Sequence, residues 1–93
     1  MIKTKAKIKL YDGSRKTPFI NGYRPLFNFI TEMKTSGQIT LIDRQVFYPN
    51  QEGIVEITFL KNSFLGKGFN IGSKFTFGEG REPLGEGVII EIL

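Results

Sequence analysis

Three glutamates near the end of the chain are the residues whose type could support acid–base chemistry. Glu79, Glu82 and Glu86 occur within one short, glycine-rich segment. A pair of carboxyl groups can act as general acid and general base where a cleft raises the pKa of one of them. A glycine-rich loop in a small domain is usually open to water, which does not provide such a cleft. We interpret the glutamates as an exposed, charged turn and predict that the chain is not an enzyme.

The glycine-rich segment 66–74 has the composition of a phosphate-binding loop but the wrong spacing. Its glycines, serine and lysine stand in the wrong order, and the spacing from Gly66 through Gly68 to Gly72 is one residue too long for a dinucleotide fingerprint. No helix is predicted to follow, so no helix N-terminus could hold phosphate. The sequence also has no cysteine and no histidine, which removes thiolates and the commonest metal ligand. We expect no bound nucleotide, no metal and no cofactor.

A ladder of lysines opens the chain. Residues 1–34 hold eight basic and two acidic side chains, so this third carries +6 and the remainder −2, within a net charge of +4. A basic strand could attract a phosphate backbone, most strongly at low salt. Lysines also keep an edge strand from pairing with other molecules, and from charge alone we favour this second interpretation. The ladder consists of Lys3, Lys5, Lys7 and Lys9.

Apolar and polar residues alternate with a period of two in the same segment, which predicts a strand over residues 2–10 with one wet face. Turn residues separate the later apolar segments, and Ser36 with Gly37 is one predicted turn. The nine phenylalanines are interpreted mainly as core. Six or seven short strands without helical periodicity indicate a small antiparallel barrel or sandwich, and the pattern does not choose between them. The later strands are predicted over 26–31, 38–42, 54–60, 73–77 and 88–93.

Length and composition indicate a single domain over residues 1–93. Hydrophobic residues make up 40% of the chain and charged residues 24%, which is typical of a globular protein. No apolar run approaches the roughly 20 residues that span a bilayer, and the first residues lack a continuous apolar signal core. We therefore expect a cytoplasmic protein that does not enter a membrane.

Two motifs resemble the C-terminal (third) β-barrel domain of translation elongation factor Tu. That family has Arg-His-Thr-Pro-Phe, two variable residues and Gly-Tyr-Arg-Pro, and here only the His is changed, to Lys16. The segment 75–80 followed by 84–89 resembles the family's final hairpin at the matching distance from the chain end. The first motif consists of Arg15, Lys16, Thr17, Pro18, Phe19, Gly22, Tyr23, Arg24 and Pro25.

The resemblance implies an all-β fold, a small six-stranded antiparallel closed barrel. It also implies partners, because the family domain touches the backbone of the tRNA T-stem, its own GTPase domain and the nucleotide-exchange factor. Carried over by motif, the RNA-contacting residues are Arg15, Lys16, Ser36, Glu79 and Gly80. Basic groups suit phosphate oxygens, whereas a carboxylate, a hydroxyl and a backbone amide suit 2′-hydroxyls. We interpret Gly-Tyr-Arg-Pro itself as mainly structural.

Departures from the family pattern fall close to the same surface. Leu26 replaces a Gln, Ile30 and Gly78 replace Arg residues, and Glu86 and Glu91 stand where Ala and Lys are usual. Each such loss of basic charge or gain of acidic charge weakens the attraction for phosphate. Any RNA surface would therefore shift toward the Lys3–Lys9 ladder.

Two functions of different class follow. The first is a non-catalytic, translation-associated module that binds tRNA or structured RNA through the five carried-over residues and the lysine ladder. The second is a protein-interaction module, a mimic or adaptor that binds a translation GTPase or its exchange factor through Arg24, Leu26 and Ile30. An exposed apolar patch near Leu26 and Ile30 would favour a protein partner, whereas a continuous basic stripe would favour RNA.

Overall fold

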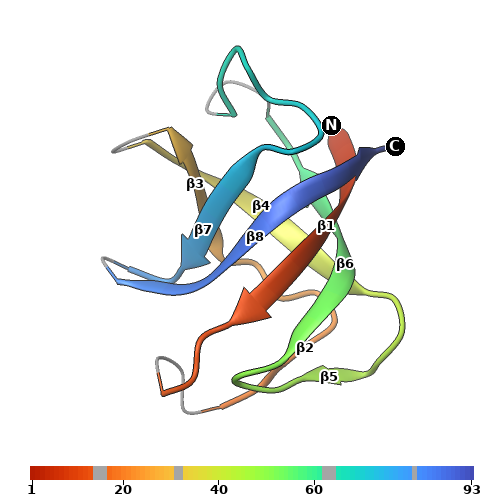
Figure 1. The fold of residues 1–93 in the computed structure, drawn as a ribbon, viewed down its shortest axis with the longest axis vertical. Coiled ribbons are helices and arrows are strands. Elements are labelled where there is room, and N and C mark those ends of the chain that lie inside the picture. Colours follow the sequence, from red (N-terminus) through yellow and green to blue (C-terminus); the bar gives the residue numbers. More distant parts are fainter. Residues whose placement is uncertain (14–16, 31–32, 62–64, 81) are drawn as a thin grey trace.

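Six antiparallel strands close into a barrel in the computed structural model (Figure 1). The structure describes residues 1–13, 17–30, 33–61, 65–80 and 82–93. The small six-stranded closed barrel that the resemblance implies is confirmed, whereas the strand pattern alone had left a sandwich equally open. Around the barrel the order is β1 (Ile2–Leu10), β6 (Glu52–Phe59), β4 (Met33–Leu41), β3 (Leu26–Ile30), β7 (Lys74–Gly78) and β8 (Pro83–Ile92), which pairs again with β1.

The lysine-bearing strand β1 pairs on both sides, with β6 and with β8. Its interpretation as an edge strand is therefore wrong, because closure of the barrel satisfies the hydrogen bonds of both of its margins. The predicted alternation is confirmed, since Thr4, Ala6, Ile8 and Leu10 are buried and the lysines between them point outward. The lysines thus occupy the outer surface of a central strand.

The predicted turn at Ser36 and Gly37 is wrong, because both residues lie inside β4. Gly37 pairs with Phe59 across the sheet. A Cβ atom on Gly37 would lie only 2.9 Å from the Phe59 ring and 3.0 Å from the Phe27 ring. The glycine is in the strand because two aromatic rings occupy the space that a side chain would need.

The final strand begins at Pro83, five residues before the predicted start at residue 88. The reason is the same, because Gly85 pairs with Phe77 and Gly87 with Phe75. A Cβ on Gly85 would overlap the Phe77 ring and the carbonyl oxygen of Lys9. These glycines resemble turn residues in the sequence but seat aromatic rings inside the barrel.

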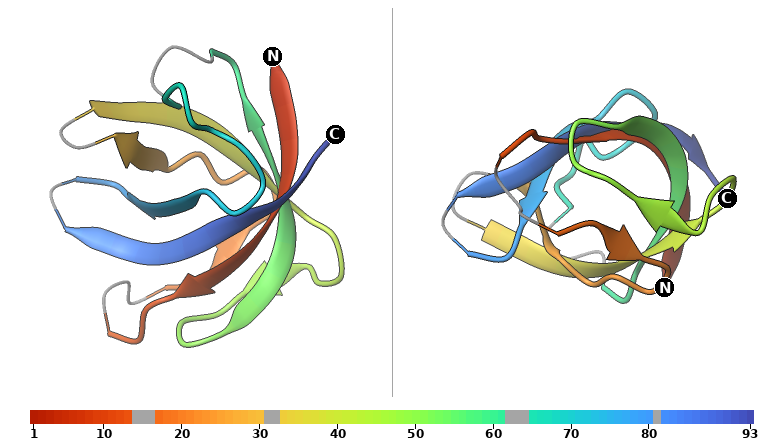
Figure 2. Two further views of the ribbon diagram at one scale, coloured as in Figure 1. Left: turned by 45° about the horizontal axis from the view of Figure 1, so that its top comes forward. Right: turned by 90° about the horizontal axis from the view of Figure 1, so that it is seen from below.

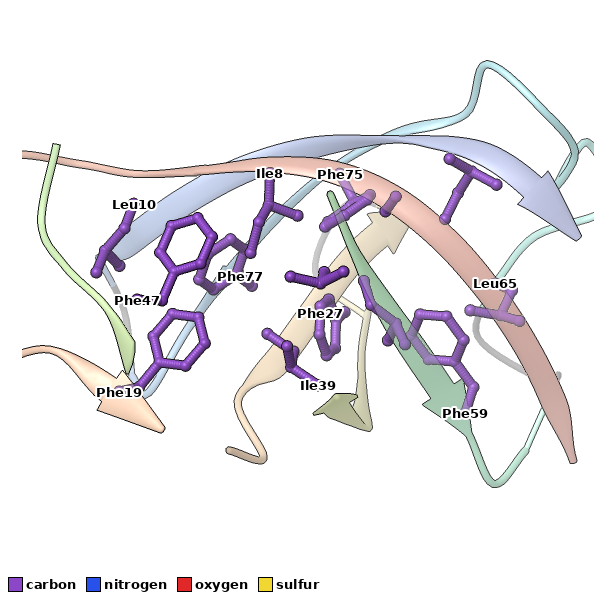
Figure 3. Close-up of a cluster of buried hydrophobic side chains, with 14 residues drawn as sticks. Ile8, Leu10, Phe19, Phe27, Ile39, Phe47, Phe59, Leu65, Phe75 and Phe77 are labelled. Carbon is purple, nitrogen blue, oxygen red and sulfur yellow. The ribbon is translucent and has the colours of Figure 1, made fainter. Parts of the chain in front are cut away.

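The described phenylalanines fill the barrel or pack against its core, as predicted. Figure 3 shows rings and aliphatic side chains from opposite strands meeting in the interior. Phe27 meets Phe59 edge to face, with ring centroids 5.2 Å apart, and lies 5.6 Å from Phe75. Such pairs add to the stabilisation from apolar burial.

A separate two-stranded sheet covers the end of the barrel away from the chain termini (Figures 1 and 2). It consists of β2 (Phe19–Ile20) and β5 (Val46–Phe47). Phe19 stacks on Phe47 at 5.1 Å and on Tyr23 at 4.5 Å. Phe19 of the first motif and the Tyr23 ring of the second therefore help to close this end of the barrel. Among the described residues there is no helix that could cross a membrane.

Replacing Gly85 by Ala should lower the free energy of unfolding by about 2–3 kcal/mol, because the added methyl must displace the Phe77 ring or the β1 backbone. Gly68→Ala is the matched control, since nothing lies within 4 Å of a Cβ at that position. Its free energy of unfolding should stay within about 0.5 kcal/mol of the parent. Guanidinium denaturation followed by circular dichroism measures both, and equal midpoints would contradict the packing described here.

Candidate functional site

The lysine ladder does not form a continuous basic stripe on the described surface. Lys5 lies between Glu56 on β6 and Glu91 on β8. Lys9 lies between Glu52 and Glu86 on the same two strands. Opposite charges directly across a sheet attract weakly, by about 0.2–1 kcal/mol per pair. A polyphosphate laid along this face would therefore meet carboxylates beside every second lysine.

Two contacts show how these carboxylates are used. Lys5 Nζ lies 3.8 Å from Glu91 Oε1, and the Tyr11 hydroxyl donates a hydrogen bond of 2.9 Å to Glu86 Oε1. Partial burial of the Tyr11 hydroxyl raises its pKa, and Glu86 raises it further through the hydrogen bond and its negative charge. Glu86 is thus held on the sheet surface by a tyrosine from the end of β1.

Glu79 and Gly80, both predicted to contact RNA, are bonded within the protein. The Tyr23 hydroxyl donates to Glu79 Oε2 at 2.5 Å, and Lys34 Nζ donates to the carbonyl oxygen of Gly80 at 2.5 Å. These bonds tie the β7–β8 connection to the segment before β3 and to β4. The sequence did not predict the Tyr23–Glu79 bond, because the two residues are 56 positions apart and no local pattern connects positions at that separation.

Leu26 and Arg24, two of the three predicted protein-interface residues, lie near Ser36. Leu26 pairs with Ser36 across β3 and β4, and both side chains are exposed. The Arg24 guanidinium donates a 3.0 Å hydrogen bond to the Gln38 amide oxygen, which places it two residues along β4. Ile30 ends β3 opposite Met33, and its side chain lies outside the described part of the structure. Arg15 and Lys16 also lie outside the described residues.

A row of exposed apolar side chains extends from Leu26 across four strands of the barrel. The register continues it through Ser36 to Leu60, which follows β6, and to Met1, which precedes β1. Leu26 is 38% exposed, Leu60 54% and Met1 87%. We call Leu26, Ser36, Leu60 and Met1 the apolar row. The outward position of Leu60 could have been found from the sequence, because Glu56, Thr58 and Leu60 share one parity.

The apolar row borders a shallow depression of about 150 Å³. Arg24 and Gln38 form its polar side, and Leu60 and Met1 its apolar side. A second depression of about 100 Å³ has Leu26, Lys34 and Pro83 in its lining. Both are shallow recesses in the sheet surface, and their mixed lining suits a side chain of a docking partner better than a buried substrate.

The remaining chemical groups do not converge. Among the described residues no three or more carboxylate, histidine or cysteine groups gather where a metal could bind. Glu79 accepts from Tyr23 and Glu86 from Tyr11, so two of the three glutamates are bonded to different parts of the barrel. In the glycine-rich segment, Gly66 and Gly72 have positive φ values of 94° and 93°, which turns require and side chains resist.

No protein-family model matches the chain. The likeness to the third barrel domain of elongation factor Tu accordingly stays a prediction that rests on its two motifs. The closed barrel agrees with it in architecture, but a small antiparallel barrel can serve many unrelated functions.

Removing the Tyr23 hydroxyl should loosen the β7–β8 connection. Tyr23→Phe keeps the ring stacked on Phe19 but loses the bond to Glu79, so the free energy of unfolding should fall by about 1 kcal/mol. Amide hydrogens near Glu79 should exchange faster than in the parent. Tyr48→Phe, an equivalent change at an exposed tyrosine, should alter neither measurement. Equal exchange rates in both variants would mean that the bond does not hold the connection.

Proposed function

We propose that this protein is a non-catalytic binding module whose main partner is another protein. The observation that carries the proposal is the apolar row, in which exposed Leu60 and Met1 line one depression with Arg24 and Ser36, and exposed Leu26 pairs with Ser36. Exposed apolar side chains that gather in one place, rather than singly, are typical of interaction sites. Methionine and arginine are also enriched at protein interfaces.

The electrostatics of the outer sheet favour the same class of partner. Lys5 and Lys9 of β1 each lie between two cross-strand glutamates, so this part of the surface lacks the continuous positive charge that a nucleic acid backbone requires. The Glu79 carboxylate, a group predicted to contact RNA, already accepts a hydrogen bond from Tyr23, and the carbonyl oxygen of Gly80 accepts one from Lys34. Using them for RNA would mean sharing or breaking these bonds.

The resemblance suggests which protein this partner is. In the elongation factor Tu family, the corresponding barrel packs on its own GTPase domain and contacts the exchange factor. A leucine at position 26, where that family has glutamine, adds apolar surface next to the motif shared with it. We therefore propose a translation GTPase or its exchange factor as the partner, with this module acting as a mimic or adaptor.

The double variant Leu26→Thr with Leu60→Thr should weaken binding to purified elongation factor Tu or its exchange factor by at least about tenfold, because central apolar side chains dominate interface energetics. Threonine keeps a strand-compatible side chain at both positions. The matched control is Ile20→Thr with Ile71→Thr, which removes comparably exposed isoleucines outside the row. Biolayer interferometry measures the affinity of the parent and of both double variants for each factor. Equal affinities for the two double variants, or no binding by the parent to either factor, would refute the proposal.

Structured RNA is the second candidate. The observation in its favour is that Ser36 and Lys34 share the exposed face of β4, and that Lys34 contacts Gly80 on the neighbouring hairpin. Two of the five residues carried over from the family, Ser36 and Gly80, thus have Lys34 as a common neighbour. Hydroxyl, ammonium and peptide groups in such an arrangement suit the shallow minor groove of an A-form stem.

Binding to tRNA should depend on Arg15 and Lys16 if this second function holds. Fluorescence anisotropy across a salt series would compare the parent with Arg15→Ala/Lys16→Ala, which should bind more weakly and with a smaller salt slope, because fewer counterions are released. The charge-matched control is Lys61→Ala/Lys67→Ala. The absence of binding by the parent at low salt would eliminate the RNA function and leave the protein partner untouched.

A further inference from the structure

A second exposed row crosses the barrel on β6, β1, β8 and β7, which lie side by side in Figure 1. Its members in this order are Ile54, Lys7, Val88 and Lys74, each the cross-strand partner of the next. Ile54 is exposed and Val88 half-buried. Lys7, Val88 and Lys74 of this row line a depression of about 260 Å³, which Lys9, Gly87 and the carboxylate residues Glu52 and Glu86 also border. We call this set of four residues the mixed row.

The mixed row differs in charge from its neighbours. Two residues away in each direction along β1, Lys5 and Lys9 each have glutamates on both sides. Lys7 instead has Ile54 and Val88 as its neighbours, and Lys74 has Val88. Among the described residues, neither Lys7 nor Lys74 takes part in an ion pair. Two ammonium groups separated by an aliphatic side chain are thus left for an external partner.

We propose that the mixed row docks an amphipathic helix that carries aliphatic and acidic side chains at alternate turns of one face. Adjacent strands lie about 4.8 Å apart, and successive turns of a helix about 5.4 Å apart. A helix laid across the strands can therefore place an aliphatic side chain on Ile54, a carboxylate on Lys7, an aliphatic side chain on Val88 and a carboxylate on Lys74. This surface is distinct from the apolar row, which meets β1 at Met1.

The flanking residues determine the class of partner. The neighbouring lysines are about 7 Å away along β1, and each is bracketed by glutamates. A nucleic acid strand or an anionic membrane presents negative charge over a wider area, so it would meet Glu52, Glu56, Glu86 and Glu91. A helix about 10 Å wide with neutral or basic flanks avoids this repulsion and can use those glutamates to fix its orientation.

The probe is a synthetic amphipathic helix with Leu, Glu, Leu and Glu at successive turns of one face, titrated into the ¹⁵N-labelled chain. Saturable amide shifts centred on the four residues of the mixed row are expected. Lys7→Ala/Lys74→Ala should weaken this binding roughly tenfold through loss of two rim ion pairs. Lys61→Ala/Lys67→Ala, with the same net charge, should bind like the parent.

Reversing the charges on both partners distinguishes docking at the mixed row from general electrostatic attraction. Lys7→Glu/Lys74→Glu should lose the glutamate peptide and gain the peptide in which both Glu are Lys. All variants change exposed side chains, and an unchanged dispersion of amide signals would confirm that they fold. Shifts spread over all lysines, equal binding of a scrambled peptide or of single-stranded DNA, or no saturable shifts would each overturn the proposal.

Discussion

The packing of aromatic rings against strand glycines is the constraint on which the barrel depends. A closed barrel of six strands has little interior volume, and here Phe27, Phe59, Phe75 and Phe77 fill much of it. Full rings can fit only where a facing strand provides no side chain. Gly37, Gly85 and Gly87 provide that space, each paired with one of these rings. Pairing, register and closure are therefore coupled, because shifting a strand by one residue would place a ring against a side chain.

The same register organises the outer surface. Once the inward positions are taken by rings and branched aliphatic residues, their neighbours must face outward in rows that cross the strands. The rows differ in chemistry: the apolar row joins Leu26 to Met1, the rows through Lys5 and Lys9 alternate in charge, and the mixed row through Lys7 combines ammonium and aliphatic groups. The rows in which lysines lie between glutamates lack the uninterrupted positive charge that an extended polyanion would need.

Local pattern predicted some parts of this structure and not others. The alternation over residues 2–10 predicted β1 and its wet face, since strand parity needs only neighbouring residues. The predictions of a turn at Ser36–Gly37 and of a start of β8 at residue 88 were wrong. A glycine in a turn and a strand glycine that makes room for an aromatic ring cannot be distinguished in the sequence. The pairing of Lys5 and Lys9 with glutamates, and the Tyr23–Glu79 bond, depend on contacts between distant segments. Such contacts require the register, which no short-range pattern contains.

The candidate sites, too, were predictable only where they depend on residues close together in the sequence. The sequence analysis could single out Leu26, Arg24 and Ser36, because they lie in or near a recognisable motif. Their neighbours Leu60 and Met1 come from segments far from that motif in the sequence. The lysine ladder was visible in the sequence. The surface that it forms is nevertheless only partly basic, because Glu52, Glu56, Glu86 and Glu91 lie beside Lys5 and Lys9. A basic sequence segment becomes a basic surface only if the strands that flank it carry no compensating charge. In this barrel they carry it at Lys5 and Lys9 and not at Lys7, so the local surface charge is set by the register and not by the net charge.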